Sequence, residues 1–261
     1  MNRNPSGKKF TAPLVAPLPE NFSIRCLDLL GAGLGLLLAL PLVLVIALLI
    51  KLDSPGPIIY KQRRTGFDRR GRQRERRKTP RSSSERRQEE YYGKTFGIYK
   101  FRTMRREAER RTGPVWAVQD DPRITTVGRW LRQFHLDEIP QFWNVLKGEM
   151  SLVGPRPERP EIIARLVYEV PEYRLRLLVK PGLTGPAQIC QDSDHSIADV
   201  RRKTRLDLFY VTHVSVRWYM RILFLTLVKI FSSTPALEAE FIVPGLGNLR
   251  GNNKEQPHEK Q

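Results

Sequence analysis

LLGAGLGLLLALPLVLVIALLI (29–50) is the most informative segment of this chain, because it holds no charged residue between Asp28 and Lys51. Its 22 residues would make a helix about 33 Å long, which is enough to cross the apolar core of a bilayer. A secretory signal peptide is a poor match, since the apolar run is too long and no small-residue cleavage site follows it. A core helix inside a large protein is the alternative. The length and the apolar character on every face favour a membrane helix.

Pro41 lies near the middle of this segment and predicts a kink, because proline lacks the N–H of one intrahelical hydrogen bond. A kinked helix can still span the bilayer, or it can turn back and leave through the face it entered. The basic residues on its two flanks are Lys8, Lys9 and Arg25 before it, and Lys51, Lys61, Arg63 and Arg64 after it. Lys and Arg collect on cytoplasmic flanks. The two flanks therefore favour a re-entrant helix over residues 22–52.

The chain is strongly basic, with 45 Lys and Arg against 27 Asp and Glu and a formal net charge of +18. Residues 61–111 hold 20 of the basic residues and 7 of the acidic ones. Such a charge attracts phosphate groups, whether in nucleotides, anionic lipids or nucleic acids. The two cysteines, Cys26 and Cys190, lie in unrelated contexts, which predicts neither a zinc site nor a disulfide framework.

The rest of the chain predicts an α/β fold that is mainly helical. We expect a strand and basic turn at 57–67, a strand at 95–104, two helices broken near Pro140 within 128–147 and capped by Gly148, and a helix at 161–179. Residues 180–188 predict a turn-rich loop. Residues 198–230 are apolar and amphipathic, and they suit either the membrane interface or the core of the folded domain.

Asp137 and Glu138 are adjacent carboxylates that precede a proline and an apolar helix. The structural interpretation is that Asp caps the helix and Glu suits its first turn. The chemical interpretation is that a carboxylate here attacks phosphorus or holds a divalent cation, while Arg132 and Arg156 neutralise phosphate charge. His135 has no partner at metal-ligand spacing. The sequence contains no P-loop, GxGxxG, HExxH or GxSxG motif.

Four motifs follow one another along the chain: IYKFRTM (98–104), DPRITTVGRWLR (121–132), LDEIPQFWNVLKGEMSLVGPRP (136–157) and KPGLTGPAQ (180–188). The segment around Pro41 and then PGPIIYKQRRTG (55–66) precede them. This ordered set resembles the bacterial sugar transferase family, the monotopic polyprenyl-phosphate phosphoglycosyl transferases, over roughly residues 22–232. Each motif alone is modest evidence, whereas their order is very specific.

The resemblance implies a role for the dyad. Asp137 matches the family's nucleophile and Glu138 its neighbouring glutamate, and Mg²⁺ would be held at this pair with the substrate diphosphate. Pro41 matches the family's helix break. The basic residues that flank the motifs, and that would bind substrate phosphate, are Lys100, Arg102, Arg132 and Arg156.

The implied reaction transfers a sugar-1-phosphate from a nucleotide sugar, expected to be a UDP-sugar, onto polyprenyl phosphate through an aspartyl intermediate, with release of UMP. Such an enzyme would act at the cytoplasmic face of the bacterial inner membrane, in a first membrane step of exopolysaccharide, lipopolysaccharide or glycoconjugate synthesis. Its partners would be the nucleotide sugar, the polyprenyl lipid and the membrane, with no nucleic acid. The sugar, the pathway and association into a homo-oligomer stay open.

The implied domain plan has a flexible tail (1–21), the re-entrant helix, a small cytoplasmic catalytic domain with interfacial amphipathic helices (53–232) and a polar tail (233–261). The chain departs from the family at 72–93, an Arg-rich insertion that has too few apolar residues to build a core. The larger relatives carry several membrane helices before this point, so the resemblance predicts the short form of the family.

Two other functions are weighed against this one. A membrane-anchored scaffold that binds anionic lipid or nucleic acid through residues 61–111 would explain the charge, but not the ordered motifs. That segment also lacks the interleaved aromatic residues of nucleic-acid modules. An ordinary glycosyltransferase would release a nucleoside diphosphate instead of UMP, so the leaving product separates the two enzymes.

Overall fold

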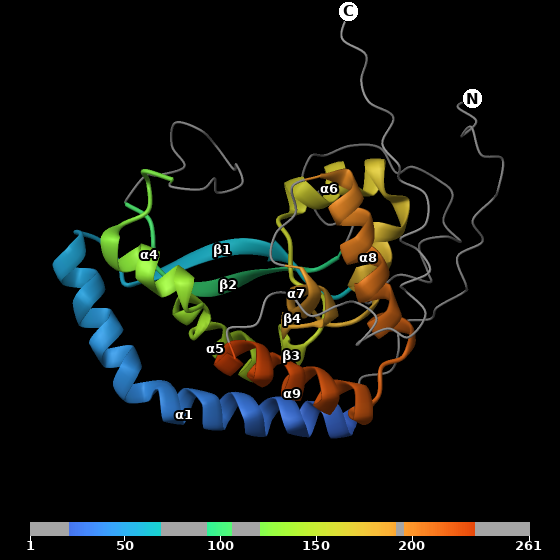
Figure 1. Cartoon of the computed structure of the whole chain (residues 1–261), viewed down its shortest axis with the longest axis horizontal. Helices are drawn as coiled ribbons and strands as arrows, with labels where there is room; N and C mark the ends of the chain where they lie inside the picture. The colour runs from blue at the N-terminus through green and yellow to red at the C-terminus, as the bar shows by residue number, and fades with distance from the viewer. Residues whose placement is uncertain (1–20, 69–92, 106–120, 192–195, 233–261) are drawn as a thin grey trace, which may run out of the picture.

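The computed structural model describes residues 21–68, 93–105, 121–191 and 196–232. The predicted N-terminal tail, except Asn21, the predicted C-terminal tail and most of the Arg-rich insertion lie outside these ranges. The described chain is mostly helical with a few short strands, which confirms the coarse prediction (Figure 1). The elements, in chain order, are α1 (Phe22–Asp53), β1 (Ile59–Thr65), β2 (Thr95–Phe101), α4 (Thr126–Gln133), η1 (Leu136–Glu138), α5 (Gln141–Leu146), β3 (Ser151–Val153), α6 (Pro160–Glu169), η2 (Pro171–Leu178), β4 (Gly182–Thr184), α7 (Pro186–Cys190), α8 (Ile197–Thr212) and α9 (Val216–Ser232).

Helix α1 is one helix of 32 residues, long and apolar enough to cross a membrane. Asn21 caps its start by accepting a hydrogen bond from the Ser23 N–H at 3.0 Å. The helix bends along its course in Figure 1. Pro41 inside the helix accounts for a bend, because it removes one hydrogen bond and crowds the preceding turn. Only 11% of an 18-residue apolar stretch of this helix is buried. The core helix of a soluble protein would be mostly buried, so the folded domain does not enclose α1 in that way.

The strands of the described segments form two small sheets. β1 and β2 pair antiparallel, from Ile59 opposite Phe101 to Thr65 opposite Thr95, which confirms the strands predicted there. β3 and β4 pair parallel. The prediction of a plain loop at 180–188 is wrong, since this segment contains β4 and α7. A Cβ atom on Gly182 would lie 2.0 Å from the Gly154 nitrogen, so the pairing of β3 with β4 depends on close backbone contact. Such contact leaves no alternating pattern in the sequence.

Within the described part of the chain, three apolar clusters make up the core, and α1 contributes to two of them. Ile24 and Ala32 in its first half join the main cluster, which also contains residues of β3, α7, α8 and α9. Ile46 and Ile50 in its second half join a cluster with β2 and α4. A third cluster lies between α6, η2 and α8. The domain is therefore built along α1 as well as around its own strands (Figure 1).

Asp28 fastens the first half of α1 to the rest of the domain. Its Oδ1 accepts hydrogen bonds from the Ser151 hydroxyl, the Leu152 N–H and the Tyr219 hydroxyl, each at 2.8 Å. The side chain is buried, with 2% of the residue exposed. One carboxylate thus joins three elements, namely α1, β3 and α9.

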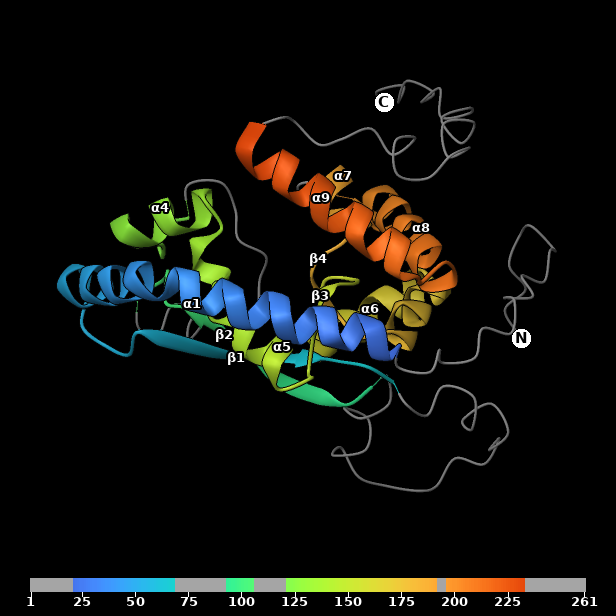
Figure 2. The same cartoon turned by 90° about the horizontal axis from the view of Figure 1, so that it is seen from below.

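The apolar segment predicted at 198–230 forms two helices, α8 and α9. The buried face of α9 packs on the domain through Tyr219 and Ile222. Its other side exposes an apolar stripe, with the exposed Arg217 and Arg221 beside it; the stripe consists of Val216, Met220, Phe224, Leu227 and Ile230. Both views show α9 on the same side of the molecule as α1 (Figures 1 and 2). The sequence left open whether this segment belongs to the membrane interface or to the core. In α9 one face belongs to the core, and the opposite face suits a membrane interface.

Candidate active site

The Asp137–Glu138 pair lies in η1, a short 3₁₀ turn between α4 and α5. His135 leads into this turn with a φ of +55°, a left-handed conformation that His adopts more readily than most side chains. The N–H groups of Glu138 and Ile139 then donate to the carbonyls of His135 and Leu136, at 3.1 and 3.3 Å. Both acidic residues are buried, with 7% of Asp137 and 9% of Glu138 exposed.

Capping does not explain the position of Asp137. Helix α5 begins at Gln141, and the residue at its N-cap position is Pro140. The interpretation of Asp137 as an N-cap is therefore wrong. The predicted break between two helices is present, but it begins at Phe134, earlier than expected. Gly148 follows α5 with a φ of +76°, as expected of a glycine after a helix end.

Glu138 is paired with cations from two different elements. Lys100 of β2 places its Nζ 2.6 Å from Glu138 Oε1. Arg156, in the loop after β3, donates from Nη1 to Oε2 at 3.2 Å and from Nη2 to Oε1. Burial alone would raise the pKa of Glu138, but Arg156 and Lys100 outweigh it and hold this pKa well below its ordinary value. Glu138 therefore stays ionised well below its ordinary pKa of 4.5, and both of its oxygens accept from cations.

Asp137 has the opposite balance. Among the described residues its ion pair is with Lys100, at 3.7 Å between Nζ and Oδ2, and no hydrogen bond from them reaches its carboxylate. Burial raises the pKa of Asp137 above its ordinary 3.8, and although Lys100 lowers it, the neighbouring charge of Glu138 adds to the rise. Asp137 is therefore the more basic and the less engaged of the two carboxylates.

Arg132 approaches the pair from the last turn of α4. Its Nε donates to the Thr103 hydroxyl at 2.9 Å, and its charge acts to lower the pKa of Asp137. Gly128 permits this approach, because a Cβ atom there would lie 2.1 Å from the Thr103 carbonyl oxygen. The site thus brings together four predicted residues besides Arg132: Lys100, Asp137, Glu138 and Arg156.

Arg102, predicted to bind phosphate, is directed elsewhere. Its guanidinium donates to the carbonyls of Ile50, Ser54 and Pro55, at 3.2, 2.5 and 3.0 Å. These carbonyls lie at and just beyond the C-terminal end of α1: the Ile50 carbonyl also accepts from the Ser54 N–H, whereas Ser54 and Pro55 follow the last helical residue. Arg102 is buried, with 6% of the residue exposed. The placement does not support a phosphate-binding role, because Arg102 instead binds the carbonyls at the end of α1.

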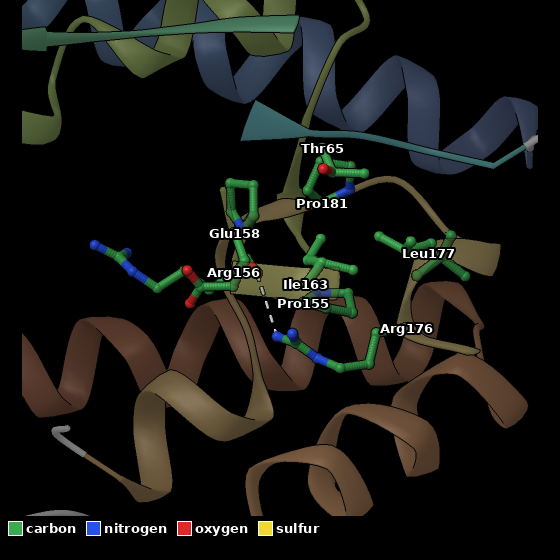
Figure 3. A pocket seen from close by; sticks show the side chains of 10 residues that line it. Thr65, Pro155, Arg156, Glu158, Ile163, Arg176, Leu177 and Pro181 are labelled. Carbon is green, nitrogen blue, oxygen red and sulfur yellow. Dashed lines mark hydrogen bonds between the residues drawn. The ribbon is translucent and has the colours of Figure 1, made fainter. Parts of the chain in front are cut away.

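A second group of charged residues lies behind the Arg156 loop, and the sequence analysis missed it. Glu158 accepts from Arg64 Nη1 at 3.1 Å and from Lys203 Nζ at 3.3 Å. Burial raises the pKa of Glu158, but Lys203 and Arg64 more than offset this and lower it overall. Figure 3 shows part of this region, where a cavity of about 10 Å³ is lined by Arg156, Glu158 and Arg176 among others, room for about one water molecule. The motif PRPE (155–158) contains Glu158 and could have pointed to it. Arg64 and Lys203 stand in basic segments, where nothing in the sequence distinguishes them from their neighbours.

The donor set permits one kind of metal site. No group of three or more His, Cys, Asp or Glu among the described residues could hold an ion. Mg²⁺, however, is usually bound by one or two carboxylates together with substrate phosphates. Asp137 and Glu138 fit that pattern, and Asp137 offers the freer oxygens because Glu138 already accepts from two cations. Mg²⁺ at this pair stays a prediction.

The arrangement favours chemistry on an anionic phosphate ester. The cations Lys100, Arg132 and Arg156 can neutralise phosphate charge. Glu138 holds Lys100 and Arg156 in place, and the more basic Asp137 remains available for attack.

The chain is similar to one protein family and to several known proteins. A family model described as bacterial sugar transferase matches residues 19–233. A UDP-N-acetylgalactosamine-undecaprenyl-phosphate N-acetylgalactosaminephosphotransferase of Aeromonas hydrophila is 34% identical over 89% of this chain and 48% of its own length. A UDP-glucose:undecaprenyl-phosphate glucose-1-phosphate transferase of Escherichia coli (strain K12) is 37% identical over 81% of this chain and 41% of its own length.

The chain spans about half or less of those two relatives. It covers 93% of another, the exopolysaccharide production protein PSS of Rhizobium leguminosarum bv. phaseoli, at 38% identity over 78% of this chain. The shared part in all three includes the dyad region, since each match takes in more than three quarters of this sequence.

Proposed function

This chain belongs to the bacterial sugar transferase family, and from that premise we propose that it transfers a sugar-1-phosphate from a UDP-sugar to undecaprenyl or another polyprenyl phosphate. The names of the relatives describe undecaprenyl-phosphate sugar phosphotransferases. Their sugars differ from one another, so the sugar of this protein is left to experiment.

The unequal dyad is the observation that carries the proposal. A carboxylate that attacks phosphorus must be ionised, must not be tied up by other groups, and gains nucleophilicity as its basicity rises. Asp137 fits this description because its pKa is raised and its ion pair is 3.7 Å long. Glu138 does not, since Lys100 and Arg156 occupy it. We assign attack to Asp137, and to Glu138 the task of holding the two cations.

The reaction would proceed in two balanced steps. An Asp137 oxygen forms a bond to the phosphorus that carries the sugar, and the bond from that phosphorus to the bridging oxygen breaks, so that UMP leaves. An oxygen of polyprenyl phosphate then attacks the same phosphorus, and the Asp137 carboxylate is released. The product is a polyprenyl-diphospho-sugar. Because the steps are separate, the soluble donor and the lipid acceptor need not be bound together.

Charge must be screened before a carboxylate can approach a diphosphate. Lys100, Arg132 and Arg156 supply positive charge around the dyad. Mg²⁺, when held by Asp137, Glu138 and the diphosphate, would add Lewis-acid neutralisation of the departing phosphate. Attack on phosphorus is performed by the chain's own carboxylate.

The membrane arrangement also supports the proposal. The lipid acceptor carries its phosphate at the headgroup plane, and α1 with the apolar face of α9 would hold the domain at that plane. We propose that α1 is re-entrant, since Pro41 accounts for a bend in it, and that the catalytic domain, residues 53–232, faces the cytoplasm of the bacterial cell. The product would then serve polysaccharide or glycoconjugate synthesis.

The test is a transfer assay with the full-length protein, a panel of radiolabelled UDP-sugars and undecaprenyl phosphate. We expect label in the lipid fraction with one donor, together with an equal amount of UMP. Release of UDP would instead indicate an ordinary glycosyltransferase. Folded protein that transfers none of the sugars would contradict the proposal.

The metal is tested in the same assay. EDTA should abolish transfer and added Mg²⁺ should restore it, because the dyad provides oxygen ligands of the kind Mg²⁺ prefers. Transfer that persists after exhaustive chelation would show that no divalent ion takes part.

A further inference from the structure

The loop that carries Arg156 is held by its carbonyl groups. Pro155 and Pro157 lack N–H groups, so the loop can offer few donors of its own. Four consecutive carbonyls nevertheless all accept hydrogen bonds from other elements: Pro155 from the Gly182 N–H at 3.0 Å, Arg156 from Arg176 Nη2 at 3.2 Å, Pro157 from Arg64 Nη1 at 3.1 Å and Glu158 from the Thr65 N–H at 2.9 Å. The donors come from β4, η2 and β1. The backbone at Arg156 is therefore fixed from several sides.

The donor to the Arg156 carbonyl is itself part of a buried ion pair. Arg176 Nε donates to Asp207 Oδ2 at 2.6 Å, and the guanidinium lies 4.4 Å from the centre of the Tyr173 ring. The Arg176 side chain is 3% exposed and that of Asp207 is 0% exposed. Figure 3 shows Arg176 reaching the Arg156 carbonyl (dashed line), while the Arg156 side chain extends away from it. Asp207 on α8 is thereby linked, through Arg176 and the loop backbone, to Arg156, which binds Glu138.

Stability alone is a weak reason for such a pair. Removing two charges from water costs about as much as their attraction returns, and a well-packed apolar pair of similar volume is often as stable. An apolar pair, however, could not donate to the Arg156 carbonyl. Groups that orient a functional side chain from behind commonly change activity strongly when they are removed.

We propose that Arg176 and Asp207 are positioning residues, which fix the backbone at Arg156 so that its guanidinium reaches Glu138 and the substrate phosphate. The inference rests on the proposed function, because it is there that Arg156 acts on a phosphate. Asp207 holds Arg176 in one orientation, Arg176 holds the carbonyl, and Arg156 makes the functional contact.

The first test replaces the pair as a unit, with Arg176→Met and Asp207→Leu in one protein, so that no single charge is left buried. We expect kcat for sugar-phosphate transfer to fall about 10- to 100-fold, while the melting temperature and the KM for the UDP-sugar change little. Arg165→Met on α6, an exposed arginine, is the matched control and should leave kcat unchanged. An unchanged kcat in the folded double variant would overturn the inference.

A double-mutant cycle separates positioning from a general structural role. If Arg176 and Asp207 act through Arg156, then adding their replacement to Arg156→Ala should lower kcat by less than about 3-fold further, because the side chain they position is gone. A further loss as large as in the wild-type background would show that they act independently of Arg156, and would refute the inference.

Hydrogen exchange supplies a readout that does not depend on transfer. The peptide 151–159 should exchange faster in the double variant than in the wild type, while peptides from α9 should not. Unchanged exchange in that peptide would contradict the inference, whether or not the wild type transfers sugar. A wild type that transfers no sugar would contradict only the proposed function.

If the double variant fails to fold, Arg176→Lys takes its place. Lysine keeps the charge but loses the planar fork, so kcat and exchange should change in the same direction as in the double variant.

Discussion

Asp137 and Glu138 are neighbours in one turn, yet their surroundings move their pKa values in opposite directions. Burial dominates at Asp137 and raises its pKa, whereas Arg156 and Lys100 overcome burial at Glu138 and lower its pKa. Two carboxylates whose pKa values are driven apart commonly serve different roles in one reaction. Here this division agrees with the proposal that Asp137 reacts and that Glu138 holds Lys100 and Arg156.

The role of Asp137 can be tested by Asp137→Asn, which keeps the size of the side chain and removes its charge. We expect transfer to fall by at least about 10³-fold, as is usual when a nucleophile is lost. Circular dichroism should match the wild type and the melting temperature should not fall, because capping does not depend on this residue and the variant removes a buried charge. Substantial transfer by the purified, folded variant would exclude the covalent mechanism.

The pH dependence follows from the same residue. Asp137 must be ionised to attack, so kcat/KM should rise with pH through its pKa, at values above 3.8 because burial raises that pKa. Lys100→Met removes the cation that lowers this pKa most, and should move the acid limb to still higher pH. Lys147→Met, which removes a lysine paired with Glu149, is the control and should leave the limb in place. A limb that does not move in Lys100→Met would contradict the assignment.

The two carboxylates affect folding stability with opposite signs. The pKa of Glu138 is lowered in the folded state, so its stabilising contribution is present above its ordinary 4.5 and is lost as the pH falls toward the folded pKa. The pKa of Asp137 is raised, so the folded state loses stability as the pH rises from 3.8 through the folded pKa. Asp137→Asn should remove the second effect alone.

The sequence predicted the dyad and three of its cations, because chemistry-bearing residue types stood in an ordered set of motifs. It could not predict which basic residue would turn toward the site. Lys100 and Arg102 occupy the same short segment, two positions apart, yet Lys100 reaches Glu138 and Arg102 reaches the end of α1. Side-chain direction at the end of a strand depends on what packs there, and in this fold α1 packs there.

Among the elements, the contact between Arg102 and α1 gives a clear test. Arg102→Met should lower the free energy of unfolding by about 2–3 kcal/mol, because it removes the buried donor to the carbonyls of Ser54 and Pro55 at the end of α1. The KM for the UDP-sugar should stay nearly constant in membranes where the protein is folded. A large rise in KM with unchanged thermal stability would restore the phosphate-binding role.

The long elements were predictable and the short ones were not. The apolar run predicts α1, and alternation predicts β2, since each pattern continues over many residues. β4 has three residues and α7 has five, too few to show a period. Their positions depend on contact with Gly154 of the distant β3 loop, which is a tertiary contact. η1 is similar, because its start depends on a left-handed His135.

For the molecule as a whole, Asp28 is a buried polar contact that attaches the first half of α1 to the domain. Asp28→Ala would leave three buried donors without their acceptor, and should destabilise the protein by about 3 kcal/mol. Asp28→Asn keeps an oxygen acceptor and is the matched control, with a much smaller effect expected. Thermal unfolding in detergent measures both. Equal stability of Asp28→Ala and wild type would show that this carboxylate adds nothing to the attachment of α1.

The topology of α1 determines on which side of the membrane the domain and the N-terminal tail lie. The helix contains Pro41, is bent and has basic residues on both flanks, and its apolar surface is largely left uncovered by the domain. A helix that returns to its own side would keep both flanks in the cytoplasm, where Lys and Arg are favoured. We therefore predict the same sidedness for Lys8→Cys and Lys61→Cys, each made in a protein in which Cys26 and Cys190 are replaced by alanine.

Labelling of intact cells with a membrane-impermeant thiol reagent gives the readout. Neither cysteine should react until the inner membrane is opened, after which both should react. Pro41→Leu is the informative variant, because it restores the missing hydrogen bond and should straighten the helix, which is long enough to cross once straight. In that variant the cysteine at position 8 should become accessible from outside while the one at position 61 stays protected. If position 8 is already accessible in the protein with Pro41, α1 spans the membrane, and the bend serves only to fit the helix against its domain.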